Sequence, residues 1–150
     1  MIEVRPTPRR IEDMPPASNF SRLLGIEVVT CTPEKVVCCM AITEAMANRN
    51  GVLHGGAFMT LSDAAAGTLT FINSPAEMSN TTVESKTNFI RPVKVGDTLT
   101  AQGVPLHVGR KTLVLQVTLT RGDGKIAGVT SQTHLFLGWA APETTDGGQG

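Results

Sequence analysis

The sequence passes from a polar, glycine-rich loop into a helix at Asn48-Arg49-Asn50-Gly51-Val52-Leu53-His54-Gly55-Gly56. The run that follows, from Ala57 to about Phe71, carries one isolated acid, Asp63, the only ionisable side chain between His54 and Glu77. A helix start offers unpaired backbone N–H groups and the positive end of the helix dipole. Glycines at that point let another molecule approach the backbone closely. This junction is therefore the first candidate for a functional site.

Apolar residues recur at helical spacing from Gly55 to about Ile72, which predicts a helix with one apolar stripe of Phe58, Leu61, Ala65, Leu69 and Ile72. Asp63 lies away from the centre of this stripe. On its side are mostly small residues, namely Gly56, Met59, Ala66, Gly67 and Thr70. Since such a face would be exposed in a monomer, we expect at least a dimer.

The remaining segments predict strands, separated by turn residues. Two strands are expected before the loop, at 26–32 and 35–42, and four after the helix, at 81–91, 98–108, 113–119 and 126–137. Pro105 predicts a bulge or a sheet edge within its strand. Because the connections are short, we expect the last four strands to form a largely antiparallel meander.

Two strands, one long helix and four strands predict an α+β fold in which the sheet curls around the helix. We expect one domain at 17–139, between a flexible N-terminal arm at 1–16 and a disordered C-terminal tail at 140–150. Ser18 is expected to cap a short helix that ends at Gly25.

The composition narrows the class of protein. Thirteen basic and thirteen acidic residues cancel in 150 residues, which argues against nucleic acid or an anionic membrane as the main partner. Cys31, Cys38 and Cys39 lack metal-ligand spacing and are expected to be free thiols in a reducing compartment. There is no apolar segment of membrane-spanning length, so we expect a soluble, cytoplasmic protein.

The motif Asn48-x-x-Gly51-x-x-His54-Gly55-Gly56, with an acid nine residues after the histidine, resembles that of hotdog-fold acyl-CoA thioesterases. The resemblance continues through the later segments Asn88-Phe89-Ile90-Arg91-Pro92, Gly96, Gly109-Arg110 and Gly124, and covers roughly residues 20–138. The sequence is most similar to the phenylacetate-pathway (PaaI-like) group, which includes the Arthrobacter-type 4-hydroxybenzoyl-CoA thioesterases.

The resemblance implies a curved antiparallel sheet of about six strands wrapped around one long central helix. It also implies homodimers, often paired into tetramers, whose active sites lie at the subunit interface and use residues from both chains. Acyl-CoA would be the substrate. No metal or other cofactor is implied, because coenzyme A is part of the substrate.

Thioester hydrolysis requires a nucleophile or an activated water and a stabilised oxyanion. The sequence lacks the Gly-x-Ser-x-Gly elbow, the His-Glu-x-x-His zinc motif and the phosphate-binding loop. Asp63 fits as a general base or as the nucleophile, and both roles stay open. Gly55 and Gly56 fit as backbone donors to the oxyanion or as members of a tight turn, and the resemblance favours Gly55 for the oxyanion contact.

Further residues are candidates by resemblance or by position. Asn48 can orient the thioester or the attacking water, or form a turn in its loop. His54 can hydrogen-bond the substrate or fix the loop, and Thr82 matches a hydroxyl residue that assists catalysis from the other subunit in some relatives. The candidates for binding the substrate and its coenzyme A are Gly56, Asn88, Arg91, Gly109, Arg110 and Lys111, although charged turn residues are often merely solvated. His107 and His134 receive no role.

Two other functions are compatible with such a fold. A hydratase or dehydratase acting on acyl-CoA uses a different arrangement of histidine and acid, without His-Gly-Gly before the helix. A non-catalytic acyl-CoA-binding module would have no need of Asp63. The sequence leaves the acyl group open.

Overall fold

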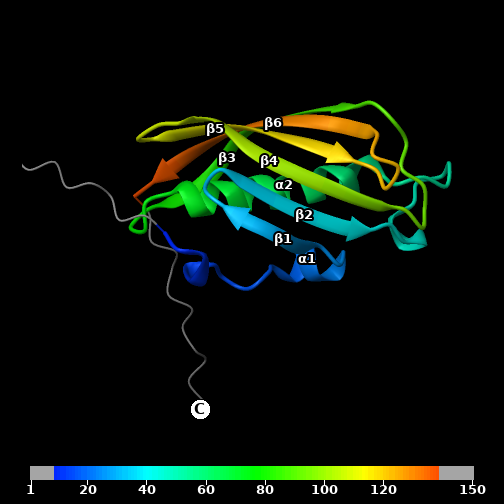
Figure 1. The fold of residues 1–150 in the computed structure, drawn as a ribbon, viewed down its shortest axis with the longest axis horizontal. Coiled ribbons are helices and arrows are strands. Elements are labelled where there is room, and N and C mark those ends of the chain that lie inside the picture. Colours follow the sequence, from blue (N-terminus) through cyan, green and yellow to red (C-terminus); the bar gives the residue numbers. More distant parts are fainter. Residues whose placement is uncertain (1–8, 139–150) are drawn as a thin grey trace, which may run out of the picture.

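The computed structural model describes residues 9–138 of the chain, and a six-stranded sheet curls around one long helix, α2 (Figure 1). The elements, in chain order, are η1 (Ile11–Asp13), α1 (Asn19–Leu23), β1 (Glu27–Thr32), β2 (Lys35–Ala41), η2 (Glu44–Met46), α2 (Gly55–Asn73), β3 (Ser79–Phe89), β4 (Thr98–Val108), β5 (Thr112–Thr120) and β6 (Ile126–Leu137). The C-terminal tail predicted at 140–150, Trp139 and residues 1–8 of the predicted arm lie outside the described residues.

Every helix and strand predicted from the sequence is present. The predicted α+β fold class is therefore confirmed, and the sheet is antiparallel throughout. At the start of α1, the Ser18 hydroxyl accepts a hydrogen bond from the Ser21 backbone N–H at 3.1 Å. The helix ends before Gly25, whose φ of 65° is readily adopted only by glycine.

The strand order is β1-β2-β4-β5-β6-β3, so the predicted meander is correct for β4 to β6 and wrong for β3. β3 pairs with β6 at the opposite edge of the sheet from β1. The connection at 90–97 is long enough to cross the sheet. Its eight residues span about 26 Å when extended, whereas β3 and β4 are three inter-strand spacings apart, or about 14 Å. The backbone N–H groups of Ile90 and Arg91 both donate to the Ala127 carbonyl, at 2.7 and 2.9 Å, which ties the crossing to β6.

Two of the four register shifts in the sheet bear on the predictions and on the site. The shift between Pro105 and His107 confirms the bulge predicted from the proline. A second shift, between Thr82 and Glu84 in β3, had no signal in the sequence. Because one extra residue is inserted there, Thr82 and Ser85 point to the same face of the sheet although they are three positions apart.

The predicted apolar stripe of α2 is buried in the core. It packs against inward residues of β2, β4 and β5, among them Met40, Leu99 and Leu115. The prediction of an exposed small-residue face is correct for Gly56 and Met59, but Ala66 and Thr70 are fully buried. The reason is that α2 contacts all six strands, so the curled sheet covers more of the helix than one stripe.

The N-terminal segment is in contact with the domain from Arg9 onward, within the arm that the sequence predicts to be flexible. The Arg9 guanidinium lies over the Phe71 ring, 4.1 Å from its centroid, and donates to the Ser74 hydroxyl and to the Met78 carbonyl. No helix within residues 9–138 is long and apolar enough to cross a membrane.

Candidate active site

His54 caps the start of α2. The His54 Nδ1 accepts a hydrogen bond from the Gly56 backbone N–H at 2.9 Å. The backbone N–H of His54 donates to the Met46 carbonyl. The Gly56 N–H is therefore already engaged, whereas the Gly55 N–H is at the first helical position, where the helix provides no acceptor. Of the two glycines predicted to bind the oxyanion, the geometry favours Gly55, and His54 fixes the loop.

Asn48 organises the loop before the helix. Its Oδ1 accepts from the Asn50 backbone N–H at 2.8 Å, and its carbonyl accepts from Gly51, whose φ of 73° requires a glycine. This confirms the turn role of Asn48. Among the described residues no hydrogen bond occupies its side-chain NH₂ group, and Asn48 lines a cavity of about 400 Å³ together with Gly55 and Arg91.

Asp63 is exposed on α2, and one of its oxygens is held by a residue that the sequence analysis did not select. Gln132 Nε2 donates to Asp63 Oδ1 at 3.1 Å and to Ser85 Oγ at 2.9 Å. Gln132 Oε1 is 2.8 Å from His134 Nε2, and His134 Nδ1 is 3.5 Å from Thr82 Oγ1, at the long end of hydrogen bonding. Thr82 is therefore linked to Asp63 through two buried side chains.

The sequence contained a signal for this network. In the strand at 126–137, the positions that alternate onto the buried face are Thr130, Gln132 and His134, which are polar where apolar residues are expected. Burial lowers the pKa of His134, and the charge of Asp63 only partly opposes this effect, so the imidazole is neutral near neutral pH.

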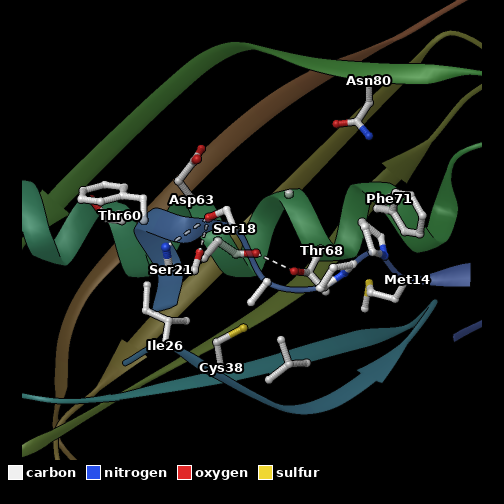
Figure 2. Close-up of a pocket in the computed structure, with 17 residues that line it drawn as sticks. Met14, Ser18, Ser21, Ile26, Cys38, Thr60, Asp63, Thr68, Phe71 and Asn80 are labelled. Carbon is white, nitrogen blue, oxygen red and sulfur yellow. Dashed lines mark hydrogen bonds between the residues drawn. The ribbon is translucent and has the colours of Figure 1, made fainter. Parts of the chain in front are cut away.

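A mostly apolar cavity of about 460 Å³ lies beside Asp63 (Figure 2). The N-terminal segment from Met14 to Ser21 crosses α2 and forms one wall. Asp63 and Asn80 lie on the β3 side of the cavity, and Ile26 and Cys38 lie on the opposite side (Figure 2). The cavity therefore joins an apolar space to a carboxylate.

The predicted catalytic residues do not surround one cavity in a single chain. Asp63 lines the cavity described above, His54 and Gly56 line a second of about 390 Å³, and Asn48 and Gly55 line the third. Asp63 is eight positions after Gly55 in the helix, which places the two residues about 12 Å apart along the helix axis.

The residues predicted to bind coenzyme A are also separated. The Arg91 side chain donates to the Ile126 carbonyl at the first residue of β6, and Asn88 accepts from Lys86. Gly109, Arg110 and Lys111 form the β4–β5 turn, which contacts the other end of β6 through the Phe136 N–H and the Lys111 carbonyl. The two contact points on β6, Ile126 and Phe136, are ten positions apart, or roughly 33 Å.

The three cysteines are free thiols, as predicted. Cys38 is fully buried, and burial raises the pKa of its thiol to about 12. Within residues 9–138 no three side chains of the metal-binding types come together.

The chain is similar to proteins of one family. Residues 50–127 match the thioesterase superfamily. Human acyl-coenzyme A thioesterase 13 is 31% identical over 118 residues, which cover 77% of this chain and 84% of the relative. Acyl-coenzyme A thioesterase PaaI of Escherichia coli is 27% identical over 119 residues, covering 79% and 83%. A hypothetical thioesterase protein from Streptococcus pneumoniae, solved with coenzyme A, has a TM-score of 0.70 and 26% identity over 77% of this chain and 88% of that one. The chain therefore belongs to the thioesterase superfamily, in its PaaI-like group of hotdog-fold thioester hydrolases.

Proposed function

We propose that the protein hydrolyses acyl-CoA to a carboxylate and free coenzyme A, with Asp63 as the attacking group and the Gly55 N–H as the oxyanion donor. One observation carries the proposal. Asp63 is an exposed carboxylate beside an apolar cavity, on the helix whose first free N–H belongs to Gly55. No metal or redox cofactor enters the proposed reaction.

Asp63 can act in two ways. As a general base it takes a proton from water, whose oxygen attacks the carbonyl carbon; the C–S bond then breaks and the thiolate is protonated. As a nucleophile it forms an anhydride with the acyl group and releases the thiolate, and water then hydrolyses the anhydride. In a single turnover in ¹⁸O-labelled water, label in Asp63 would establish the nucleophilic route, because it enters only when water attacks the Asp63 carbonyl carbon of the anhydride.

We infer that each site is completed by a second copy of the chain. An oxyanion donor and a carboxylate that attacks the same carbonyl lie within about 7 Å of each other. Gly55 and Asp63 of one chain are roughly 12 Å apart, which is too far. The position of β3 at the edge of the sheet and the exposed side chains of Met59, Val83 and Phe89 support a homodimer formed on this side. Pairing of two dimers into a tetramer is part of the proposal.

The cavity beside Asp63 supports an aryl or a short to medium acyl group as the substrate, because its walls are mostly apolar and it lies within the usual size range of ligand pockets. Arg91 of one chain and Arg110 and Lys111 of the other are proposed to meet the phosphates of coenzyme A. Two chains are required since these residues are at opposite ends of β6.

The test measures release of free coenzyme A from aryl, short-chain and medium-chain acyl-CoA. Asp63→Asn should lose about a hundredfold or more of the wild-type rate. Gly55→Pro removes the N–H, and proline is tolerated at a first helical position, so a loss of roughly a hundredfold is expected.

Gly55→Ala is the matched control, because it keeps the N–H and its Cβ would make ordinary contact with Phe89 at 3.5 Å. It should remain near the wild-type rate. Undiminished hydrolysis by Asp63→Asn would exclude the proposal. Hydration of crotonyl-CoA would support a hydratase instead, and tight binding without turnover a binding module.

A further inference from the structure

We propose that Gln132 is a positioning residue that holds the Asp63 carboxylate in its reactive orientation, and that His134 holds Gln132. The proposal rests on the function proposed for Asp63. The side chains of Gln132 and His134 are almost fully buried on the inner face of β6, where they connect Asp63 to β3.

The positions of the protons in this network follow from the charge of Asp63. An ionised carboxylate only accepts hydrogen bonds, so the Gln132 NH₂ group must face it and the Gln132 oxygen must face His134. His134 then has to carry its proton on Nε2. Its Nδ1 is left as an acceptor, which the Thr82 hydroxyl can satisfy.

The Gln132 amide has no freedom to turn. One of its two hydrogens goes to Asp63 and the other to Ser85, while its oxygen accepts from His134. Ser85 reaches this position because the bulge in β3 turns it to the inner face. Reversing the amide would place its oxygen against the Asp63 carboxylate. The Ser85 hydroxyl can donate as well as accept and His134 can change tautomer, so the contact with Asp63 is the one that fixes the amide.

The burial of these groups indicates a role beyond holding the sheet to the helix. Burial of a polar side chain is costly unless it is hydrogen-bonded, so apolar residues suffice for simple packing. The neighbouring strand β5 follows that rule, with Leu113, Leu115, Val117 and Leu119 on its buried face. β6 instead buries a polar row at the level of Asp63.

The consequence for Asp63 is that its two oxygens become different. Oδ1 is held by Gln132, whereas Oδ2 has no hydrogen-bond partner within residues 9–138. Donation from the amide stabilises the ionised carboxylate and restricts its rotation. Oδ2 is therefore left to meet water or the thioester in a fixed direction, as a base or a nucleophile requires.

The test compares two variants of Gln132. Gln132→Met removes both donors with little change in size, and Gln132→Glu places a second carboxylate beside Asp63. Both should lower kcat roughly 10-fold to 100-fold with KM changed by about threefold at most. The loss in kcat with KM nearly unchanged separates a positioning role from a role in substrate binding.

Within residues 9–138, the elements around the network present no other charged group to it. Asp63 is the only charged residue of α2, β5 has none, and Glu84 and Lys86 alternate to the outer face of β3. Thr130→Val is the matched control. It removes a part-buried hydrogen bond of 2.8 Å to Thr87 from the same face of β6 without touching Asp63, so it should leave kcat near the wild-type value.

An unchanged kcat in both Gln132 variants, or an equal loss in Thr130→Val, would overturn the proposal. A second measurement does not need turnover. In ¹³C NMR spectra at one pH, the signal of the Asp63 carboxyl carbon should move in Gln132→Met and stay in place in Thr130→Val. Gln132→Asn, which withdraws the amide by one methylene, replaces Gln132→Met if that variant does not fold. An inactive wild type would exclude the proposed function, whereas an unmoved carboxyl signal in Gln132→Met would exclude the positioning role.

Discussion

The ring of Phe58 occupies the space that a side chain at Gly128 would need. A Cβ added at Gly128 would lie 2.6 Å from Phe58 Cζ and 2.7 Å from the Asn88 carbonyl oxygen. Phe58 is on α2 and Gly128 is on β6, so this contact brings the helix that carries Asp63 against the strand that carries Gln132. Phe89 packs on the same ring, with centroids 5.1 Å apart.

Gly128→Ala should therefore destabilise the fold by roughly 1–3 kcal/mol, because the backbone of β3 cannot move aside as a flexible side chain can. Urea denaturation measures the change. Gly103→Ala is the control, since its Cβ would be at ordinary contact distance, 3.5 Å from Leu69 and 3.7 Å from Val117. Equal stability of Gly128→Ala and wild type would contradict the close packing of α2 on β6.

Mixing two inactive variants should restore activity if each site uses two chains. Asp63→Asn and Gly55→Pro are each expected to be nearly inactive alone. A mixed dimer has one site with both changes and one site with neither, so random exchange should recover roughly a quarter of the wild-type rate. Unfolding and refolding the mixture before the assay allows exchange. A mixture that stays as inactive as its components would show that each site lies within one chain.

His134 should make the fold less stable in mild acid. Burial lowers the pKa of its imidazole below the ordinary value of 6.5, so below that pH the unfolded chain binds a proton that the native state does not. The free energy of unfolding should fall as the pH drops through about 6.5, by up to about 1.4 kcal/mol for each unit of pKa lowering.

Urea denaturation at several values between about pH 7.5 and pH 5 measures this dependence. His134→Gln should flatten it, while Thr130→Val, which removes no titratable group, should retain the wild-type slope. The same slope in His134→Gln would assign the effect to other groups.

Cys38 should resist alkylation in the native protein. Its thiol is fully buried on β2, and burial raises its pKa to about 12, so neither access nor thiolate is available at pH 8. Mass spectrometry after brief iodoacetamide treatment should find Cys38 unmodified until a denaturant is added. Cys39, which is partly exposed on the same strand, is the internal comparison. Modification of Cys38 at the rate of Cys39 would contradict the structure.

Much of this fold could be predicted because its signals are local. The recurrence of Phe58, Leu61 and Leu69 at helical spacing reflects the geometry of one helix, and the alternation of Leu113 to Leu119 reflects that of one strand. The loop at Asn48 to Gly56 is also local, since Asn48 bonds its own turn and His54 bonds the N–H two residues later. The sequence by itself therefore determined the elements and the family, and it supplied the proposal that Asp63 and Gly55 are the two halves of the site.

The tertiary structure decided what depends on distant residues. β3 pairs with β6 because the chain after Phe89 crosses to the far side of the meander. The turn residues next to β3 do not indicate which strand it pairs with. Gln132 meets Asp63 across 69 residues of sequence. Alternation along β6 puts Gln132 and His134 on one face of the strand, but only closure of the sheet around α2 places the Gln132 amide within hydrogen-bonding distance of the carboxylate.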